Sequence, residues 1–271
     1  ERLLSRKLRV PLELTLEVQG GASKESVVQR ARELCDQEPD LGALLGLGAR
    51  SVFAALAEAP VEKALRLLLT CTQNTPTGCF DHAVKVSMLA VAMGLRGNLP
   101  QRELDTLVIG GLAHDVGELY VNPGYLSNPR QLSLTEWQHV AVHPLIGQKV
   151  ITELTTLNKD VGLIIAGHHE HEDGSGYPLR SGKAAQSRPC RLVALAEVIS
   201  GLLHTPDNRL ARTALALKLV PGEFSADVLN LVMPRIEGQT LQTPAEFSTE
   251  KASHVVAHVE AVLRQARERA R

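Results

Sequence analysis

Aromatic residues are scarce in this sequence and make up only 3% of its 271 residues. A stacking platform for single-stranded nucleic acid needs several aromatic side chains, so this scarcity argues against one. An excess of charge is also missing, because 29 Lys and Arg residues face 30 Asp and Glu residues, for a net charge of −1. General nucleic-acid and membrane-surface binders carry a basic excess. We therefore expect no DNA or RNA partner, whereas a small anionic ligand held by a local site stays open.

Long apolar runs are missing as well. A membrane-spanning helix needs about 20 mostly apolar residues, but residues 41–49, among the longest apolar runs, are interrupted by glycines. The first ten residues are charged, lack the apolar core of a signal peptide and do not begin with Met. We therefore expect no membrane insertion. We also expect the chain to be a fragment of a longer protein, whose N-terminal regulatory domain the sequence does not identify.

Paired cysteines are absent too. The four cysteines form no Cys-x-x-Cys pair, and they are Cys35, Cys71, Cys79 and Cys190. We expect reduced thiols and not a disulfide framework. Hydrophobic residues make up 44% and charged residues 22% of the chain, as in ordinary globular proteins.

What the sequence has in abundance is helical periodicity, so we predict an all-α fold. Apolar residues recur at helical spacing in segments 26–35, 60–73, 82–95, 101–117, 133–151, 159–172, 188–204, 225–233 and 249–271. Ser133 and Glu136 have the spacing of a capping box, and Asn158 can cap the helix that follows it. Residues 12–19 alternate between apolar and polar, which is typical of an extended linker or strand.

These segments predict three regions. Residues 1–75 form a helical lead-in or accessory segment, residues 76–240 carry the chemistry, and residues 241–271 form a C-terminal helix. The C-terminal helix places apolar residues on one stripe, and it can pack on the domain or pair two chains in a homodimer.

Histidines and carboxylates interrupt several of the apolar helices. Burying one such group without a partner costs several kcal/mol, so a group of them must satisfy one another or a metal. Imidazole and carboxylate together suit iron, manganese or zinc, and the lack of a thiolate disfavours a structural cysteine-rich zinc site. Seven ligands exceed one four-coordinate ion and fit two ions. The seven candidate metal ligands are His82, His114, Asp115, His143, His168, His169 and Glu197.

Adjacent ligands raise a geometric problem. Neighbouring residues on a helix point about 100° apart, so His168 and His169 cannot both reach one ion from a regular helix. Either the helix ends there or the two imidazoles have different roles. The same geometry applies to His114 and Asp115, although a carboxylate has two oxygens and can bridge two metals.

Several motifs, in this order, resemble those of the HD-GYP family, a branch of the HD metal-dependent phosphohydrolases. They are "HDVGE" at 114–118, "LSLTEWQHVAVHP" at 132–144 with "HPLIG" at 143–147, "HHEHEDGSGYP" at 168–178 and "CRLVALAEV" at 190–198. The likeness covers about residues 78–235. It implies a helical HD-type bundle and a centre of two or three metals. It also implies hydrolysis of the bacterial messenger cyclic di-GMP to pGpG and/or GMP by a metal-bridging hydroxide, and a place in the bacterial cytoplasm.

The resemblance also assigns roles by position. His82 matches the first family histidine, His114 and Asp115 the HD pair with Asp115 as the bridge, and Glu197 the place of a family aspartate. The remaining histidine ligands match the second-metal histidines, namely His143, His168 and His169. The signature loop, which the resemblance links to shape and to contacts with diguanylate cyclase domains, comprises Asp173, Gly174, Gly176, Tyr177 and Pro178.

Three positions depart from the family pattern. Glu118 replaces a lysine, His171 replaces an arginine that can grip phosphate with two hydrogen bonds, and Gly78 replaces the glutamate of three-metal members. We therefore expect two ions, iron or manganese, and no third unless Glu118 supplies a ligand. We assign Asp115, His114 and Glu118 to catalysis, and we group His171 with the substrate-binding or signature-loop residues.

The departures keep alternative hypotheses open. The main alternative is an impaired HD-GYP module that binds a nucleotide or a protein partner without turnover. A further alternative is an HD hydrolase for another phosphoester, such as a nucleoside monophosphate, and the Gly-Tyr-Pro signature at 176–178 argues against it.

Overall fold

A computed structural model describes residues 21–73, 79–126, 131–203 and 209–240 of the chain. In these residues the regular structure is entirely helical, without a strand, so the predicted all-α fold is confirmed. The predicted extended segment 12–19 and the predicted C-terminal helix, with its proposed role in a homodimer, lie outside the described residues, as does Gly78.

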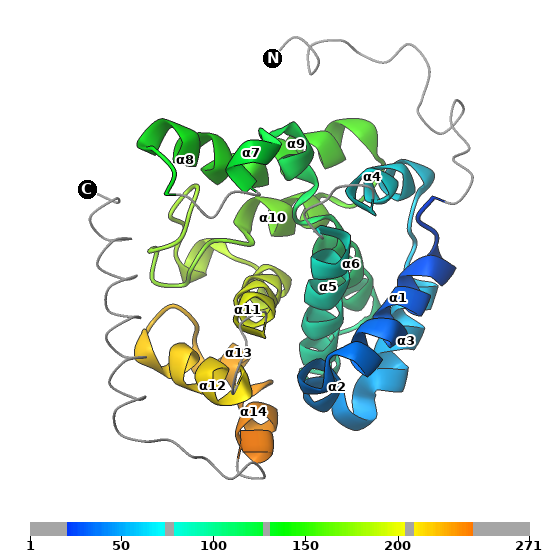
Figure 1. Ribbon diagram of the computed structural model, residues 1–271, viewed down its shortest axis with the longest axis vertical. Helices are drawn as coiled ribbons and strands as arrows, with labels where there is room; N and C mark the ends of the chain where they lie inside the picture. The colour runs from blue at the N-terminus through cyan, green and yellow to red at the C-terminus, as the bar shows by residue number, and fades with distance from the viewer. Residues whose placement is uncertain (1–20, 74–78, 127–130, 204–208, 241–271) are drawn as a thin grey trace.

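The helices form three groups along the chain (Figure 1). The first group is α1 (Lys24–Gln37), α2 (Pro39–Leu45), the 3₁₀ turn η2 (Gly46–Gly48), α3 (Ala49–Glu58) and α4 (Lys63–Gln73). The second is α5 (Cys79–Arg96), α6 (Gln101–Ala113), η3 (Val116–Tyr120), α7 (Pro123–Leu126), α8 (Leu134–Ala141), α9 (His143–Leu154) and α10 (Lys159–Gly167). The third is η4 (Lys183–Ala185), α11 (Arg188–Leu203), α12 (Arg209–Leu219), α13 (Ala226–Leu229) and α14 (Met233–Thr240).

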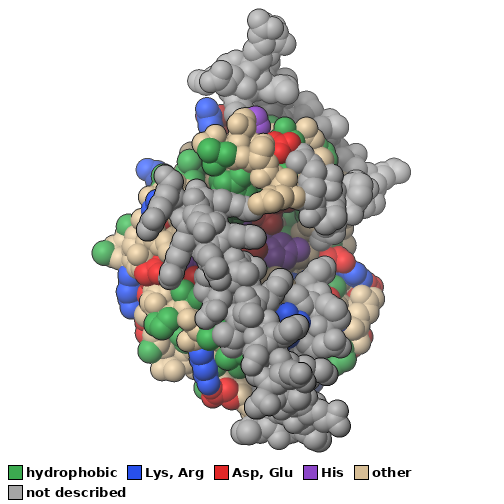
Figure 2. Space-filling model, turned by 60° about the vertical axis from the view of Figure 1, so that its left-hand side comes forward, with side chains coloured by type: hydrophobic (Ala, Val, Ile, Leu, Met, Phe, Trp, Pro, Cys, Tyr) green, Lys and Arg blue, Asp and Glu red, His purple; other side chains and the backbone are tan. Residues whose placement is uncertain are grey.

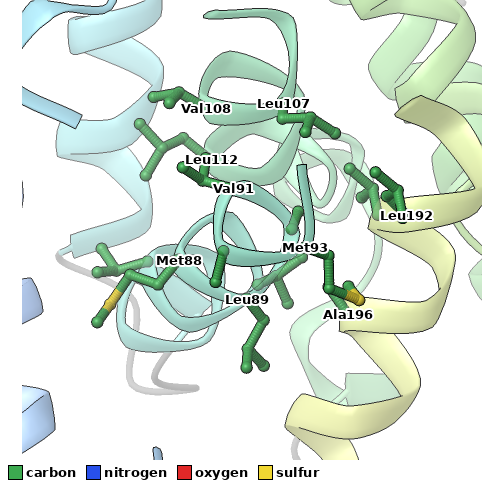
Figure 3. Packing of buried hydrophobic residues seen from close by; sticks show 14 of the residues in the cluster. Met88, Leu89, Val91, Met93, Leu107, Val108, Leu112, Leu192 and Ala196 are labelled. Atoms are coloured by element: carbon green, nitrogen blue, oxygen red, sulfur yellow. The ribbon is translucent and has the colours of Figure 1, made fainter. Parts of the chain in front are cut away.

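Helices α5, α6 and α11 lie at the centre of the bundle and bury large apolar side chains against one another (Figure 3). Helix α5 is buried almost all round from Ala83 to Gly94, as expected for a helix whose sequence is apolar on every side. Helices α5 and α6 approach closely at Gly111, where an added Cβ would lie 2.5 Å from the Cα of Ser87. Because α6 ends two residues later, at Ala113, this contact holds the chain just before His114 and Asp115.

The first group of helices belongs to the same core. Residues 39–58 are long and apolar enough, by length and composition, to cross a membrane, and they are the one such helical stretch among the described residues. However, this stretch comprises α2, η2 and α3, and its large side chains Leu41, Leu45 and Leu56 are fully buried in the bundle. Only 33% of the apolar part of this stretch is buried, and Leu47 in η2 is exposed.

The segment 133–151 differs from its prediction as one helix with His143 in its middle. The capping box is confirmed, because the hydroxyl of Ser133 accepts from the backbone N–H of Glu136 and the carboxylate of Glu136 accepts in return. But α8 ends at Ala141, and α9 begins at His143. Pro144 explains the break, since proline has no N–H for a continuing helix and fits the first turn of a new one.

Elsewhere the helix signals gave mixed results. The amide side chain of Asn158 accepts from the N–H of Asp160, so the predicted cap is confirmed. The predicted helix 225–233 is wrong in length, because α13 ends at Leu229 and a separate helix starts at Met233. Helix α12 was not predicted, although Leu210, Thr213 and Leu217 have the spacing of its buried face.

Candidate metal centre

The seven predicted ligands come together at the ends of helices around α5. His114 and Asp115 follow α6, His143 opens α9, and His168 and His169 follow α10. The other two, His82 and Glu197, lie within α5 and α11. Their ligand atoms form two groups, each with all atoms within 4.8 Å of one another: Asp115, His143, His168 and His169 in one, and His82, His114 and Glu197 in the other.

The adjacent histidines reach the same group because helix α10 ends before them. Its last residue is Gly167, and His168 is its C-cap. Of the two alternatives for His168 and His169, the structure has the helix ending at the pair. After a helix ends, successive side chains no longer point about 100° apart around an axis. The rings of His168 and His169 can therefore both face Asp115.

Asp115 connects the two groups through its two carboxylate oxygens. Its Oδ2 lies 2.9 Å from the Nε2 of His114 and 3.8 Å from the Nε2 of His82. Its Oδ1 lies 3.2 Å from the Nε2 of His143 and 3.4 Å from the Nε2 of His168. Each oxygen therefore faces a different set of imidazoles, which is the arrangement that a bridging carboxylate requires.

Backbone carbonyls fix the rings of the histidines at the helix ends. The Nδ1 atoms of His114, His143 and His168 lie 2.8, 2.8 and 2.7 Å from the carbonyl oxygens of Gly111, Val140 and Ile165. A carbonyl can only accept, so each Nδ1 carries a proton, and in the neutral ring the lone pair is on Nε2. Such partners orient the imidazoles of metal sites.

Ser200 and Glu197 hold His82 in a comparable way. The Nδ1 of His82 lies 3.1 Å from the hydroxyl of Ser200, and its Nε2 lies 2.8 Å from Oε2 of Glu197. Ser200 is one turn after Glu197 on α11 and is buried. One face of α11 therefore contacts both nitrogens of His82.

The donor atoms fit a divalent cation. The Nε2 atoms of His143 and His168 face each other at 3.1 Å, although both carry lone pairs. The Nε2 of His114 is buried and lies 2.9 Å from Oδ2 of Asp115 and 3.3 Å from Oε2 of Glu197. Two lone pairs that face each other in this way need a proton or a cation between them, and five imidazoles with two carboxylates suit first-row divalent metals.

Burial and neighbouring charges raise the pKa values of some of these groups and lower those of others. Burial alone would lower the pKa of His114, but the carboxylates of Asp115 and Glu197 raise it well above its usual value. Burial and the neighbouring His168 lower the pKa of His169 well below its usual value. Burial and the charge of Asp115 raise the pKa of Glu118 to about 7. The thiol of Cys79 donates to Oε2 of Glu118 at 3.4 Å.

A pocket of about 340 Å³ opens onto the two groups. In Figure 2, histidine side chains in purple lie together in a hollow near the middle of the face. No Lys or Arg belongs to the described residues that line the pocket, which are Cys79, His82, Asp115, Glu118, Leu126, Val140, His143, His169, Tyr177 and Glu197.

Tyr177 is the part of the signature loop that reaches this pocket. Its ring stacks on His169, with centroids 4.5 Å apart, and meets Trp137 edge to face at 5.3 Å. Gly176 permits this stack, because an added Cβ would lie 2.4 Å from the carbonyl oxygen of His169. Asp173 instead accepts from the N–H of Ser175 within the loop.

His171 is not among the described residues that line the pocket, and its prediction as a substrate-binding or signature-loop residue stays a prediction. Its Nδ1 lies 2.9 Å from the hydroxyl of Ser175 and 3.6 Å from the carboxylate of Glu223. The side chain of His171 is partly buried, and its ring contacts that of Phe224 with centroids 5.7 Å apart.

Sequence reasoning missed Glu170, Ser200 and Cys79. Glu170 is buried, and its carboxylate accepts from the backbone N–H groups of Leu179, Arg180 and Ser181 at 2.5, 3.1 and 2.7 Å. It therefore holds the end of the signature loop. In the sequence, an acid directly after two histidines is a signal for such a role. Ser200 and Cys79 have no comparable signal.

Comparison with known proteins agrees with this fold and site. An all-α bundle that gathers histidines and an aspartate at helix ends is the arrangement of HD-type proteins, and the family model described as "HD domain" matches residues 66–220. The chain belongs to the HD domain family. HD domains bind divalent metals, and this chain has the corresponding cluster of histidine and carboxylate side chains.

Relatives with established names are cyclic dinucleotide phosphodiesterases. "Cyclic di-GMP phosphodiesterase PA4108" of Pseudomonas aeruginosa is 28% identical over 123 residues, which are 45% of this chain and 30% of that protein. "3'3'-cGAMP-specific phosphodiesterase 1" of Vibrio cholerae is 30% identical over 139 residues, which are 48% of this chain and 30% of that protein. The chain thus spans about a third of the length of these relatives. The HD-GYP resemblance predicted from the motifs is confirmed.

Two solved structures share the fold. The HDG"Y"P protein Bd1817 of Bdellovibrio bacteriovorus matches with a TM-score of 0.54 and 18% identity, over 79% of this chain and 70% of that one. The HD domain of phosphodiesterase PgpH of L. monocytogenes matches with a TM-score of 0.50 and 14% identity, over 65% and 97%. At these identities the likeness concerns the fold alone.

Proposed function

We propose that this protein is a metal-dependent phosphodiesterase that hydrolyses cyclic di-GMP to pGpG and/or GMP in bacterial second-messenger signalling. The observation that carries the proposal is the position of Asp115, whose two oxygens face two different sets of imidazole Nε2 atoms at the base of a pocket. The names of the relatives, which include cyclic di-GMP and 3'3'-cGAMP phosphodiesterases, support a cyclic dinucleotide as the substrate class.

The ligand assignment follows from the two groups of side chains. His82, His114 and Glu197 would hold one divalent ion with Oδ2 of Asp115. His143, His168 and His169 would hold the second with Oδ1 of Asp115. We expect iron or manganese, and no third ion. Bound in this way, such metals lower the pKa of water toward 7 and neutralise charge that develops on a phosphate.

The protein's own residues would orient these groups and shape the pocket. The Nδ1 bonds to backbone carbonyls keep the ligand nitrogens directed inward. Tyr177 covers one face of His169, so this ring cannot rotate away. Glu118 lines the pocket near Asp115, where its protonated carboxyl can donate to a phosphate oxygen and its ionised form repels one.

The outer side of the signature loop is the part available to a protein partner. Leu179 and Asp173 are exposed there, and we propose this side for the contact with a diguanylate cyclase domain. We further propose that the protein works in the cytoplasm, where its nucleotide substrate is made.

One observation favours a second candidate function, a module that binds a cyclic dinucleotide without turnover. The described pocket lining has no Lys or Arg to neutralise a phosphodiester, and Glu118 adds a carboxylate. Equilibrium binding and product analysis on the same manganese-loaded protein separate the two candidates. Product formation supports the phosphodiesterase, and saturable binding of cyclic di-GMP without product supports the binding module.

A further inference from the structure

Helix α1 contacts the first two turns of α5, the helix that carries His82. Arg30 on α1 donates from Nε to Oδ1 of Asp81 and from a terminal nitrogen to Oδ2 of Asp81, both at 2.7 Å. A planar guanidinium that meets both carboxylate oxygens accepts one relative orientation only. This pair, whose side chains are 26% and 39% exposed, therefore favours one rotation of α5 at the residue just before His82.

A second ion pair joins the same two helices one turn further on. Lys85 has only 3% of its side chain exposed, and its Nζ donates to Oε1 of Glu38 at 3.1 Å. A buried ammonium without a partner is strongly unfavourable, so Lys85 must stay paired with the residue that follows α1. Because Asp81 and Lys85 are four residues apart, they lie on one face of α5, and both reach toward α1.

His82 lies between these two residues, about 100° around the helix from Asp81. Its ring reaches Glu197 and Ser200 on α11, with hydrogen-bonding distances of 2.8 and 3.1 Å. Helix α5 is thus held on one face by α1 and presents His82 to α11 on another. A rotation of its first turns would move His82 away from both partners.

We infer that helix α1 positions His82 in the metal centre, with Arg30 and Glu38 as its positioning residues. The inference rests on the proposed metal centre. It adds residues outside 66–220, the part of the chain that matches the HD domain model, to those that support the metal centre, because α1 lies wholly before that part. The predicted N-terminal lead-in then has a defined function, which is to set the affinity of the ion that His82 contacts.

The test is a Mn²⁺ titration of the full chain, followed by electron paramagnetic resonance, with circular dichroism to verify folding. Arg30→Leu removes both bonds to Asp81 and also the bond to Glu33 on the same helix, and Arg30→Lys keeps the charge but loses the two-pronged contact. Arg32→Leu is the matched control, because Arg32 lies on the same helix, is exposed and contacts the ring of Phe53 on α3. Direct hydrogen-bond partners of metal ligands typically change affinity by about 10- to 100-fold, and because Arg30 acts on His82 only through Asp81 and α5, we expect the lower end of this range.

We expect Arg30→Leu to weaken one of two Mn²⁺ sites about tenfold, Arg30→Lys to give an intermediate value, and Arg32→Leu to match the wild type. A folded Arg30→Leu protein with wild-type affinity at both sites would overturn the inference, and so would an equal loss in Arg32→Leu. If Arg30→Leu does not fold, the Mn²⁺ titration is made with Asp81→Asn and Arg30→Lys instead. Weaker binding at one site supports the inference, and wild-type affinity at both sites overturns it. A wild-type protein that binds no Mn²⁺ overturns the proposed metal centre itself, which separates that failure from a failure of positioning.

Discussion

His143 and His168 face each other through their Nε2 atoms at 3.1 Å, while each ring holds its Nδ1 proton on a backbone carbonyl. Two imidazole lone pairs at this distance repel each other unless a cation or a proton lies between them. The sequence places the two residues 25 positions apart, and helix ends bring them together. This pair is why we expect a metal where the structure gathers polar groups inside an apolar bundle.

The first prediction concerns Asp115. Asp115→Asn keeps the size of the side chain but removes the charge that both groups of histidines face. We expect the metal content to fall below two ions per chain, and turnover of cyclic di-GMP to fall on the order of a thousandfold. Elemental analysis and product chromatography measure the two effects. Full metal content together with wild-type turnover in Asp115→Asn would contradict the bridging role.

The second prediction concerns Glu118. Because the two groups already supply seven ligands, we expect Glu118→Ala to bind the same number of ions as the wild type. A lower count in Glu118→Ala would instead show that Glu118 supplies a ligand to a third ion. Glu118→Gln is the matched control, since it keeps the shape of the side chain and removes only its charge.

The third prediction concerns the stack of Tyr177 on His169. Tyr177→Phe keeps the ring, whose centroid lies 4.5 Å from that of His169, so we expect its affinity for Mn²⁺ to stay at the wild-type value. Tyr177→Ala releases His169, and we expect a loss of about tenfold in affinity. A metal titration of both variants is sufficient. Equal affinities in Tyr177→Phe and Tyr177→Ala would show that the stack does not hold the ligand.

The fourth prediction concerns pH and the buried Glu172, away from the metal centre. Burial alone would raise its pKa, but hydrogen bonds from Ser225 and Arg191 lower it below 4.5. A carboxyl with a lowered folded pKa contributes stability that is full above its unfolded pKa and is lost as pH falls through the folded value. We therefore expect the free energy of unfolding to decrease as the pH falls below 4.5.

Urea unfolding of the wild type and Glu172→Gln at neutral and acidic pH measures this contribution. We expect Glu172→Gln to be less stable at neutral pH by about 1–3 kcal/mol, and the difference to shrink in acid. The same difference at every pH would mean that the charge of Glu172 does not contribute.

The sequence alone predicts the helical class and the identity of the clustered residues, because apolar periodicity and polar interruptions are local patterns. His114 and Asp115 stand out at the end of an apolar run for this reason. The division into two sets joined by Asp115 is not local, since it depends on how α5, α6, α9, α10 and α11 pack. The break before His143 was missed because the apolar spacing continues through it, although Pro144 marks the site.

The partners of the ligands were harder to predict. Ser200 is one of many small polar residues on helices, and only the packing of α11 against α5 brings it to His82. Arg30 and Asp81 are 51 positions apart, and charged residues of this kind usually lie on solvated surfaces. His171 could be singled out from its place in a motif, but its contacts with Ser175 and Glu223 could not be predicted from the sequence.

The measurement that tests the central claim most directly is product analysis of cyclic di-GMP with protein loaded anaerobically with iron or manganese. Anaerobic loading matters because air oxidises ferrous iron. We predict pGpG and/or GMP from the loaded wild type, and none above background from the metal-stripped protein or from loaded Asp115→Asn. Loaded wild-type protein that binds cyclic di-GMP and leaves it intact would contradict the account.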